Sequence, residues 1–158
     1  MTREERLHAY GPGIVEAFLR HNLPGIWGIG IARQESDFEP SAKNLAGGDA
    51  RVGGSYGLCQ VSLQTARSLR GEGVIADMLL DPSFNADIAA ELVSRLTAQY
   101  RGVLSDVLAG YNSGKPWHRA PTSTQRVYVP NVIKHMHHYA TWAKREEDRC
   151  RLKSSTGS

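Results

Sequence analysis

One carboxylate in this sequence stands at an unusual position. In the segment 25–38, GIWGIGIARQESDF, helical spacing places Trp27, Ile31 and Glu35 on one face. Pro40 disfavours helical geometry in the residue before it, so Glu35 is predicted to lie in the last helical turn. There the negative end of the helix dipole and the apolar neighbours both raise a carboxyl pKa. A carboxyl group with a raised pKa is suited to general acid catalysis.

A purely structural role is the alternative for Glu35. The side chain could point to solvent from the rim of the helix, or form an ion pair with Arg33 or Lys43. Composition alone does not separate these two interpretations of Glu35.

Length and composition indicate one globular domain. The chain has 158 residues, of which 41% are hydrophobic and 22% are charged, and its net charge of +3 is small. No apolar run is long enough to span a bilayer, and the first ten residues, MTREERLHAY, lack the apolar core of a signal peptide. We therefore expect no membrane span, no nucleic-acid partner and, for Cys59 and Cys150, free thiols.

Helical periodicity and capping residues predict a mainly α chain. Asp81 and Pro82 mark the start of the longest helix, and Gly11-Pro12-Gly13 predicts a break between two short ones. Four glycines within 39–56 predict a flexible loop or an irregular hairpin, and Pro130 predicts a kink or a restart of the last helix. The predicted helices span 2–10, 14–21, 25–38, 62–69, 82–100, 103–111 and 123–144. We expect a domain over 1–143 and a charged, fraying tail over 144–158.

Four short motifs follow one another along the chain: Gln34-Glu35-Ser36, the segment 56–60 (YGLCQ), the segment 109–114 (AGYNSG), and Tyr128-Val129. In this order and at these spacings they resemble the lytic transglycosylases of the SLT type, over about residues 26–139. The resemblance implies the fold of goose-type lysozyme, a helical domain with an irregular Gly-rich loop and little or no β structure.

The resemblance also implies roles for individual residues. Glu35 matches the catalytic acid of the family. A second set is expected to bind substrate or to support the cleft, with Ser36 mainly structural: Ser36, Gly57, Leu58, Gln60, Tyr111, Asn112 and Tyr128. The expected partner is the glycan strand of peptidoglycan, with no cofactor and no metal. Cys59 replaces the usual Met, which we expect the fold to tolerate, and Thr124-Gln125 replaces the usual Glu-Thr pair before Tyr128.

Other aromatic and imidazole side chains have two interpretations each. Tyr111 and Tyr128 could be ordinary buried tyrosines, and Trp117 could stack on a sugar or cover the core. His135 and His138 share a helix face, but no Cys or carboxylate cluster accompanies them. For these histidines we expect a packing or solvated role.

The number of carboxylates bears on the mechanism. Most glycosidases use two, one on each side of the scissile bond. Near Glu35, Asp37 lies at the wrong helical angle and Glu39 precedes a proline, so Asp49 in the Gly-rich loop is the only candidate for a second carboxylate, and its glycines predict that it is loosely held. The resemblance implies instead a route with one carboxylate and a 1,6-anhydromuramic product.

Two alternatives stay open beside this expectation. One is a hydrolytic lysozyme that uses Asp49 to position water, and the other is a non-catalytic glycan-binding or structural virion module. We expect the protein to be made in the cytoplasm and to act on peptidoglycan in the periplasm. Its expected context is a bacteriophage, where it is packaged in the particle with other virion proteins as partners or released at lysis. The alternative is a subunit of a secretion or conjugation apparatus.

Overall fold

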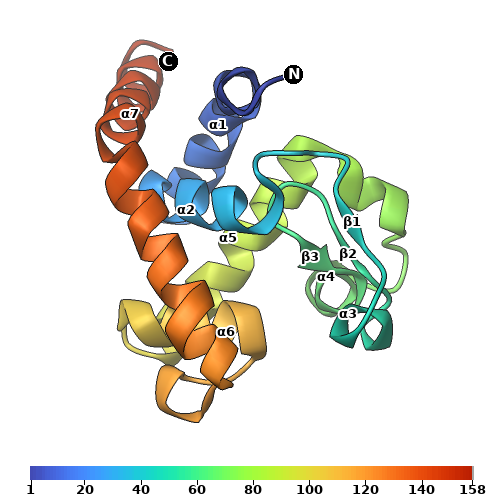
Figure 1. The fold of residues 1–158 in the computed structure, drawn as a ribbon. Coiled ribbons are helices and arrows are strands. Elements are labelled where there is room, and N and C mark those ends of the chain that lie inside the picture. Colours follow the sequence, from blue (N-terminus) through green and yellow to red (C-terminus); the bar gives the residue numbers. More distant parts are fainter. Residues whose placement is uncertain (158) are drawn as a thin grey trace.

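The helix that carries Glu35 lies at the centre of the fold. The computed structural model describes residues 1–157, and its helix α2 (Gly25–Ser36) packs most extensively on α7 (Val129–Thr156) and also on α1 (Arg3–Arg20). Figure 1 shows α2 crossing between these two helices, with α5 beside them and a small sheet to one side. The prediction of a mainly α, lysozyme-like domain is confirmed.

Helix α1 is continuous, so the predicted break at Gly11-Pro12-Gly13 is wrong. Pro12 lies inside the helix, and Gly11 is buried against α7, where an added Cβ would collide with the ring of Trp142. Packing of the whole 18-residue helix on its neighbours outweighs the cost of one proline in its interior. Gly11 therefore serves a close helix contact and not a turn.

A glycine in α2 has the same function. An added Cβ at Gly30 would lie 2.8 Å from Cγ of Met136 and 3.0 Å from the carbonyl oxygen of Val132, both on α7. The side chains of α2 that point elsewhere, such as Ile29 and Ile31, are fully buried. Close contact with α7 thus fixes the direction of the helix that carries Glu35.

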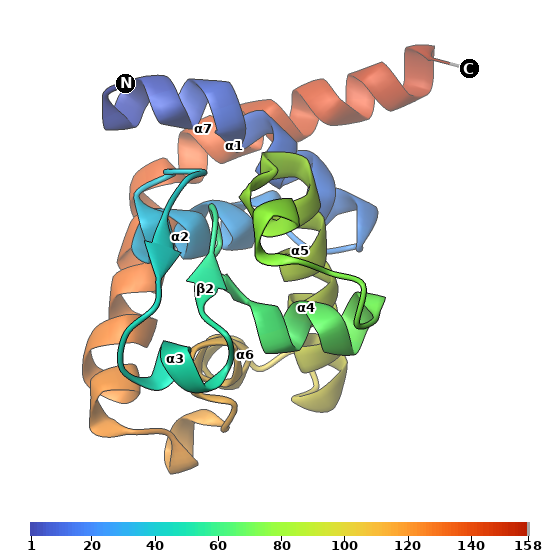
Figure 2. The same cartoon turned by 90° about the vertical axis from the view of Figure 1, so that its right-hand side faces the viewer.

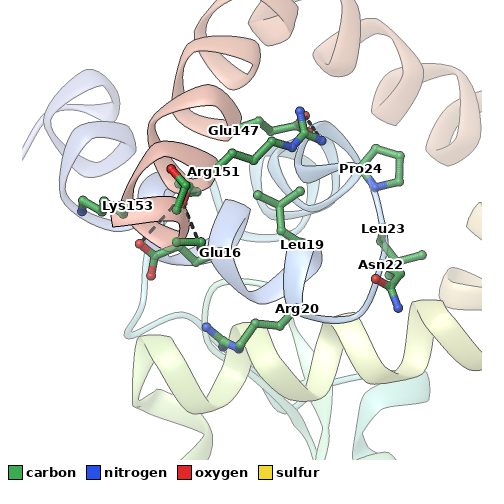
Figure 3. A pocket seen from close by; sticks show the side chains of 12 residues that line it. Glu16, Leu19, Arg20, Asn22, Leu23, Pro24, Glu147, Arg151 and Lys153 are labelled. Carbon is green, nitrogen blue, oxygen red and sulfur yellow. Dashed lines mark hydrogen bonds and ion pairs between the residues drawn. The ribbon is translucent and has the colours of Figure 1, made fainter. Parts of the chain in front are cut away.

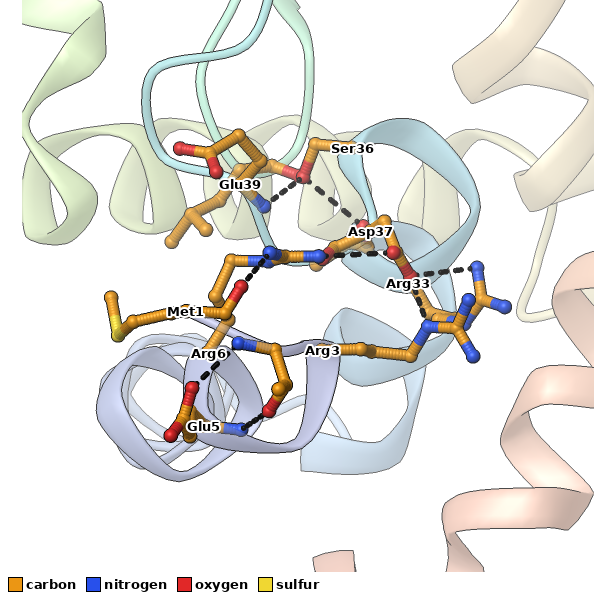
Figure 4. A network of polar contacts seen from close by, with 11 residues as sticks. Met1, Arg3, Glu5, Arg6, Arg33, Ser36, Asp37 and Glu39 are labelled. Atoms are coloured by element: carbon orange, nitrogen blue, oxygen red, sulfur yellow. Dashed lines mark hydrogen bonds and ion pairs between the residues drawn. The ribbon is translucent and has the colours of Figure 1, made fainter.

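Both ends of α2 are held by residues that are distant in the sequence. At the start, Pro24 offers no side-chain cap, and the N–H of Gly25 donates instead to Oε1 of Glu147 at 2.7 Å. At the end, Asp37 adopts a left-handed conformation with φ of 58° and pairs with Arg3, Arg6 and Arg33. Figure 4 shows these arginines converging on Asp37 beside Ser36. The last turn of α2 is therefore anchored to α1.

The Gly-rich segment forms an irregular hairpin and not a long flexible loop. Strands β1 (Lys43–Asn44) and β2 (Ser55–Tyr56) pair antiparallel, with Lys43 opposite Tyr56, and the short helix α3 (Gly48–Arg51) connects them. A third strand, β3 (Val61–Ser62), pairs antiparallel with β2, and α4 (Leu63–Arg70) follows it. In Figure 2 this part of the chain faces the viewer in front of α2 and α6.

The remaining elements complete the helical part. As predicted, Asp81 caps the helix α5 (Pro82–Gln99), accepting a hydrogen bond from the N–H of Phe84 at 2.7 Å. The other elements are η1 (Ala76–Leu80), α6 (Leu104–Ser113), η2 (Trp117–Arg119) and η3 (Thr124–Tyr128), the last a π-helical turn. Pro130 lies in the first turn of α7, where the helix restarts after this turn.

The C-terminal residues are helical further than expected. Helix α7 continues through the predicted boundary at 143 as far as Thr156, and Glu146 and Glu147 are largely buried on the helical part. The separation of a domain at 1–143 from a tail stays a prediction, and Ser158 lies outside the described residues. None of the described helices is long and apolar enough to cross a membrane.

The last turns of α7 and the end of α1 enclose an open groove of about 1030 Å³. Figure 3 shows Glu16, Leu19 and Arg20 on one side of it and Glu147, Arg151 and Lys153 on the other. Glu35 and the other candidate site residues do not line this groove. Its size therefore does not mark it as the active site.

Candidate active site

A second, smaller cleft contains Glu35. Its volume is about 770 Å³, and it lies between the small sheet with α3 on one side and α5 with α6 on the other. Glu35, Gln60, Tyr111 and Asn112 line it together, so the structure brings these four predicted residues to one place. The other polar groups that line it are Asn44, Asp49, Ser55, Ser62, Gln64, Thr65 and Ser113. Amide, hydroxyl and carboxylate groups of this kind can hydrogen-bond sugar hydroxyls.

The surroundings of Glu35 favour its protonated form. Its pKa is raised from 4.5 to about 7: burial has the largest effect, the hydrogen bond from Tyr128 lowers the pKa, and the negative charge of Asp49 raises it. Glu35 lies in the last turn of α2, as predicted. Within residues 1–157 it forms no ion pair, since Arg33 pairs with Asp37 at 3.0 Å. The ion-pair alternative for Glu35 is therefore not what the structure shows.

Tyr128 contacts the carboxylate directly. Its hydroxyl donates a hydrogen bond of 2.7 Å to Oε1 of Glu35, and its side chain is 7% exposed. Burial and the neighbouring charge of Glu35 raise the pKa of Tyr128, so the phenol stays a donor. Tyr128 does not line the cleft, so its position corresponds to support of the acid and not to substrate binding.

The substituted pair before Tyr128 supplies its own contacts. Thr124 is buried and donates from Oγ1 to Oδ1 of Asn112 at 2.7 Å, and Gln125 donates from Nε2 to the carbonyl of Trp117 at 2.6 Å. These bonds tie the π-helical turn to α6 and η2. Thr124 and Gln125, which stand in place of the Glu-Thr pair that the resemblance predicted, thus hold the turn before Tyr128.

The loop 57–60 is held from three sides. Ser36 donates to the carbonyl of Leu58 at 2.7 Å, and Tyr111 donates to the carbonyl of Cys59 at 2.6 Å. Nε2 of Gln60 donates to the carbonyls of Ala42 and Gly57, both at 3.1 Å. Helix α2, α6 and the residue before β1 are therefore joined through this loop, which places its backbone beside Glu35.

Asn85 completes this support and was not among the predicted site residues. Fully buried on α5, it donates from Nδ2 to the carbonyls of Tyr56 and Leu79 at 2.7 and 2.9 Å and accepts from the N–H of Cys59 at 2.9 Å. An added Cβ at Gly57, where φ is 78°, would collide with Asn85. The signal in the sequence was an Asn that shares a helical face with Ile88 and Leu92, where a polar group is costly unless all its atoms are paired.

Three residues expected to bind substrate lie behind the cleft. Leu58 is 1% exposed, Gly57 is packed against Asn85, and Ser36 points to the loop backbone. None of the three lines the cleft. They hold its wall in place, and a direct sugar contact is not consistent with this burial. Cys59 is fully buried in this wall, consistent with its expected role as a small packing residue.

Asp49 is held more firmly than the glycines around it predicted. Nδ2 of Asn44 donates to its Oδ2 at 2.8 Å, and the hydroxyl of Ser55 donates to its Oδ1. The N–H of Gly54 also donates to the Asp49 carbonyl at 2.7 Å. The expectation of a loosely held side chain is therefore wrong. Asp49 lines the same cleft as Glu35 and is a fixed negative charge there.

The remaining candidates lie outside the cleft. His135 contacts Oε1 of Gln34 at 3.1 Å, and among residues 1–157 no three Cys, His, Asp or Glu side chains are grouped to hold a metal. Trp117 is 42% exposed on η2, so it does not cover the core.

Comparison with known proteins shows the family of the chain. The family model of the transglycosylase SLT domain matches residues 19–127, more than half of the sequence. The chain therefore belongs to the transglycosylase SLT domain family, as the four motifs predicted. The match includes Glu35 and the next two motifs and ends one residue before Tyr128.

One solved structure shows the same fold. An inactive mutant of the lytic transglycosylase Slt from Pseudomonas aeruginosa is similar with a TM-score of 0.67 and 22% identity. The similarity covers 83% of this chain but only 24% of that one, so this chain spans about a quarter of the length of that structure. No match was found among curated protein sequences.

Proposed function

We propose that this protein is a peptidoglycan lytic transglycosylase that cleaves the β-1,4 bond between N-acetylmuramic acid and N-acetylglucosamine. The observation that carries the proposal is the buried carboxyl of Glu35 in a polar cleft, hydrogen-bonded by Tyr128 and with its pKa raised to about 7. A pKa near neutrality lets one group give a proton in one step and take it back in the next. The membership of the SLT family supports the same reaction.

In the first step, Glu35 gives its proton to the glycosidic oxygen. The bond from this oxygen to C1 of the muramic residue breaks, and the acetamido oxygen of that residue forms a bond to C1. The leaving sugar departs with a free 4-hydroxyl, and Glu35 is then ionised. Tyr128 stabilises this ion, because its hydroxyl donates to Oε1.

In the second step, Glu35 acts as a base. It removes the proton of the 6-hydroxyl of the muramic residue, whose oxygen attacks C1 and displaces the acetamido oxygen. The product is a 1,6-anhydro ring, the carboxyl is protonated again, and no water is consumed. The 6-hydroxyl is part of the bound substrate, so its effective concentration is high.

Hydrolysis is the second candidate, because Asp49 is fixed in the same cleft by Asn44 and Ser55. A second carboxylate there could activate a water molecule in place of the 6-hydroxyl. The two reactions differ in their products. Hydrolysis leaves reducing ends, whereas the intramolecular reaction leaves anhydro ends that are lighter by one water.

Mass spectrometry of the muropeptides released from purified peptidoglycan, before and after borohydride treatment, tests the proposal. We expect anhydro ends that borohydride does not reduce. Reducible ends as the main product would make the protein a lysozyme. Folded protein that binds glycan but releases no fragments would instead indicate a non-catalytic binding module.

The biological context stays a prediction. We propose that the protein is carried in a bacteriophage particle and acts on peptidoglycan in the periplasm during entry. Mass spectrometry of purified particles tests this location, and absence of the protein from them would favour a role in lysis or in a host secretion apparatus.

A further inference from the structure

The segment that follows α6 carries an unusual concentration of positive charge. Between Gly114 and Tyr128 there are three Lys or Arg side chains and one His, but no Asp or Glu. Lys115, His118, Arg119 and Arg126 are all exposed. Within residues 1–157 none of them forms an ion pair. We call these four residues, with the exposed Trp117 among them, the basic shelf.

The basic shelf continues the wall of the cleft. Ser113 and Gly114 line the cleft, and Lys115 follows directly. The hydroxyl of Ser113 donates to the carbonyl of Ala109 at 2.8 Å and accepts from the N–H of Lys115 at 3.2 Å, so the backbone at Lys115 is fixed to the cleft wall. Figure 2 shows the segment, in gold and orange, beside α6 at the lower end of the molecule.

The backbone of the basic shelf is held in place. The N–H of Trp117 donates to Oδ1 of Asp106 at 2.8 Å, and its carbonyl accepts from Gln125 at 2.6 Å. Trp117 is nevertheless 42% exposed. The basic shelf thus presents unpaired cations and one aromatic ring on a fixed backbone. Cations bind carboxylates and an aromatic ring can stack on a sugar, so this surface suits a ligand that contains both.

We propose that the basic shelf binds the stem peptides and flanking sugars of the glycan strand that occupies the cleft. This inference rests on the proposed function and names the form of its substrate. Each muramic residue of peptidoglycan carries a short peptide with free carboxylates at regular intervals along the strand. A strand that leaves the cleft past Gly114 brings one such peptide to Lys115 and Arg119, and a sugar ring to Trp117. The protein therefore prefers peptide-bearing glycan to naked glycan.

The test measures binding in the Glu35→Gln background, in which the glycan is not cleaved. The ligands are soluble glycan fragments with intact stem peptides and the same fragments after an amidase has removed the peptides. The test variant adds Lys115→Glu and Arg119→Glu. The control variant adds Arg145→Glu and Lys153→Glu, two exposed residues on the last turns of α7, and so changes the net charge equally.

We expect the parent to bind the peptide-bearing fragments about fivefold or more tightly than naked glycan, and this preference to disappear in the test variant but not in the control. The preference for peptide-bearing fragments should also become weaker at about 0.5 M salt, where exposed charges are screened. Trp117→Ala should weaken binding of both ligands. Equal losses for both ligands on charge reversal, or equally tight binding of single-stranded DNA by the parent, would overturn the inference. A parent that binds neither glycan would instead contradict the proposed function itself.

Discussion

The hydroxyl of Tyr128 lies 2.7 Å from Oε1 of Glu35, although 93 residues separate them in the sequence. This bond stabilises the ionised carboxylate, whereas burial and the charge of Asp49 stabilise the neutral form. The balance places the pKa at about 7. Two opposing effects on one carboxyl group thus allow it to act as both acid and base near neutral pH.

Tyr128→Phe should raise the pKa of Glu35. Without the donated hydrogen bond the ionised form is less stable, so the pKa of Glu35 rises and the alkaline limb of the pH–rate profile moves to higher pH. The rate itself should fall by about tenfold, because the carboxylate loses the group that orients it. Tyr10→Phe is the control, since Tyr10 lies on α1 away from the cleft. An unchanged profile in Tyr128→Phe would show that the bond does not affect catalysis.

Glu35→Gln should abolish turnover while the fold persists. The amide keeps the size of the side chain but has no proton to transfer, so the rate of muropeptide release should fall by at least about 10³-fold. Circular dichroism checks the fold. Substantial turnover by a folded variant would remove Glu35 from the mechanism.

The same variant has a second effect, on stability. The pKa of Glu35 is raised on folding, so the folded protein binds this proton more tightly than the unfolded chain does. The contribution of this proton to the free energy of unfolding is complete below about pH 4.5 and is lost as the pH rises through about 7. The change is about 3 kcal/mol, at about 1.4 kcal/mol per pH unit. The Glu35→Gln variant has no such titrating group and does not lose this stability. In urea unfolding at pH 5 and pH 8, the free energy of unfolding of the variant relative to that of the parent should therefore be higher at pH 8 than at pH 5.

Asp49→Asn distinguishes an electrostatic role from a catalytic one. Removing the charge should lower the pKa of Glu35 and move the alkaline limb to lower pH, while the rate below that limb changes little and the product keeps its anhydro ends. Asn44 and Ser55 can still hydrogen-bond the amide, so the local fold should persist. A collapse of activity at every pH, with reducible ends in the parent's product, would favour the hydrolytic mechanism.

Tyr111→Phe and Gln60→Ala test the support of the loop 57–60. Each removes a hydrogen bond that joins this loop to a neighbouring element, so each should destabilise the protein by about 1 kcal/mol and lower the rate less than loss of the acid does. Thermal melts and rates measured on the same samples provide the comparison. If both variants match the parent in rate, these residues serve packing only.

The position of Glu35, our proposed catalytic acid, was predictable because its signal is local. Glu35 stands on an apolar helical face near a helix end, and Asp81 with Pro82 marks a helix start, so neighbouring residues in the sequence suffice to predict both. The order of the four motifs likewise predicted the family and the mainly α fold.

The predictions that were wrong or missed depend on contacts between residues that are distant in the sequence. Gly11 and Pro12 are typical of a break, but the partner that makes Gly11 necessary is Trp142, which lies 131 residues further along the chain. The glycines around Asp49 predicted flexibility, yet Asn44 and Ser55 hold its side chain through strand pairing that no local pattern contains. Asn85 was missed because its partners are backbone groups, which are the same in every residue.

The cap that Glu147 provides for α2 has a consequence for biosynthesis. Gly25 and Glu147 are 122 positions apart, and the face of α2 that contains Gly30 is covered by α7. While the chain grows on the ribosome, the segment that carries Glu35 is complete early but has neither its cap nor its main packing partner. Such long sequence separation delays folding until the distant segment is available. The newly made protein should therefore remain inactive until synthesis has passed Glu147, so that cleft and acid form together in one late step.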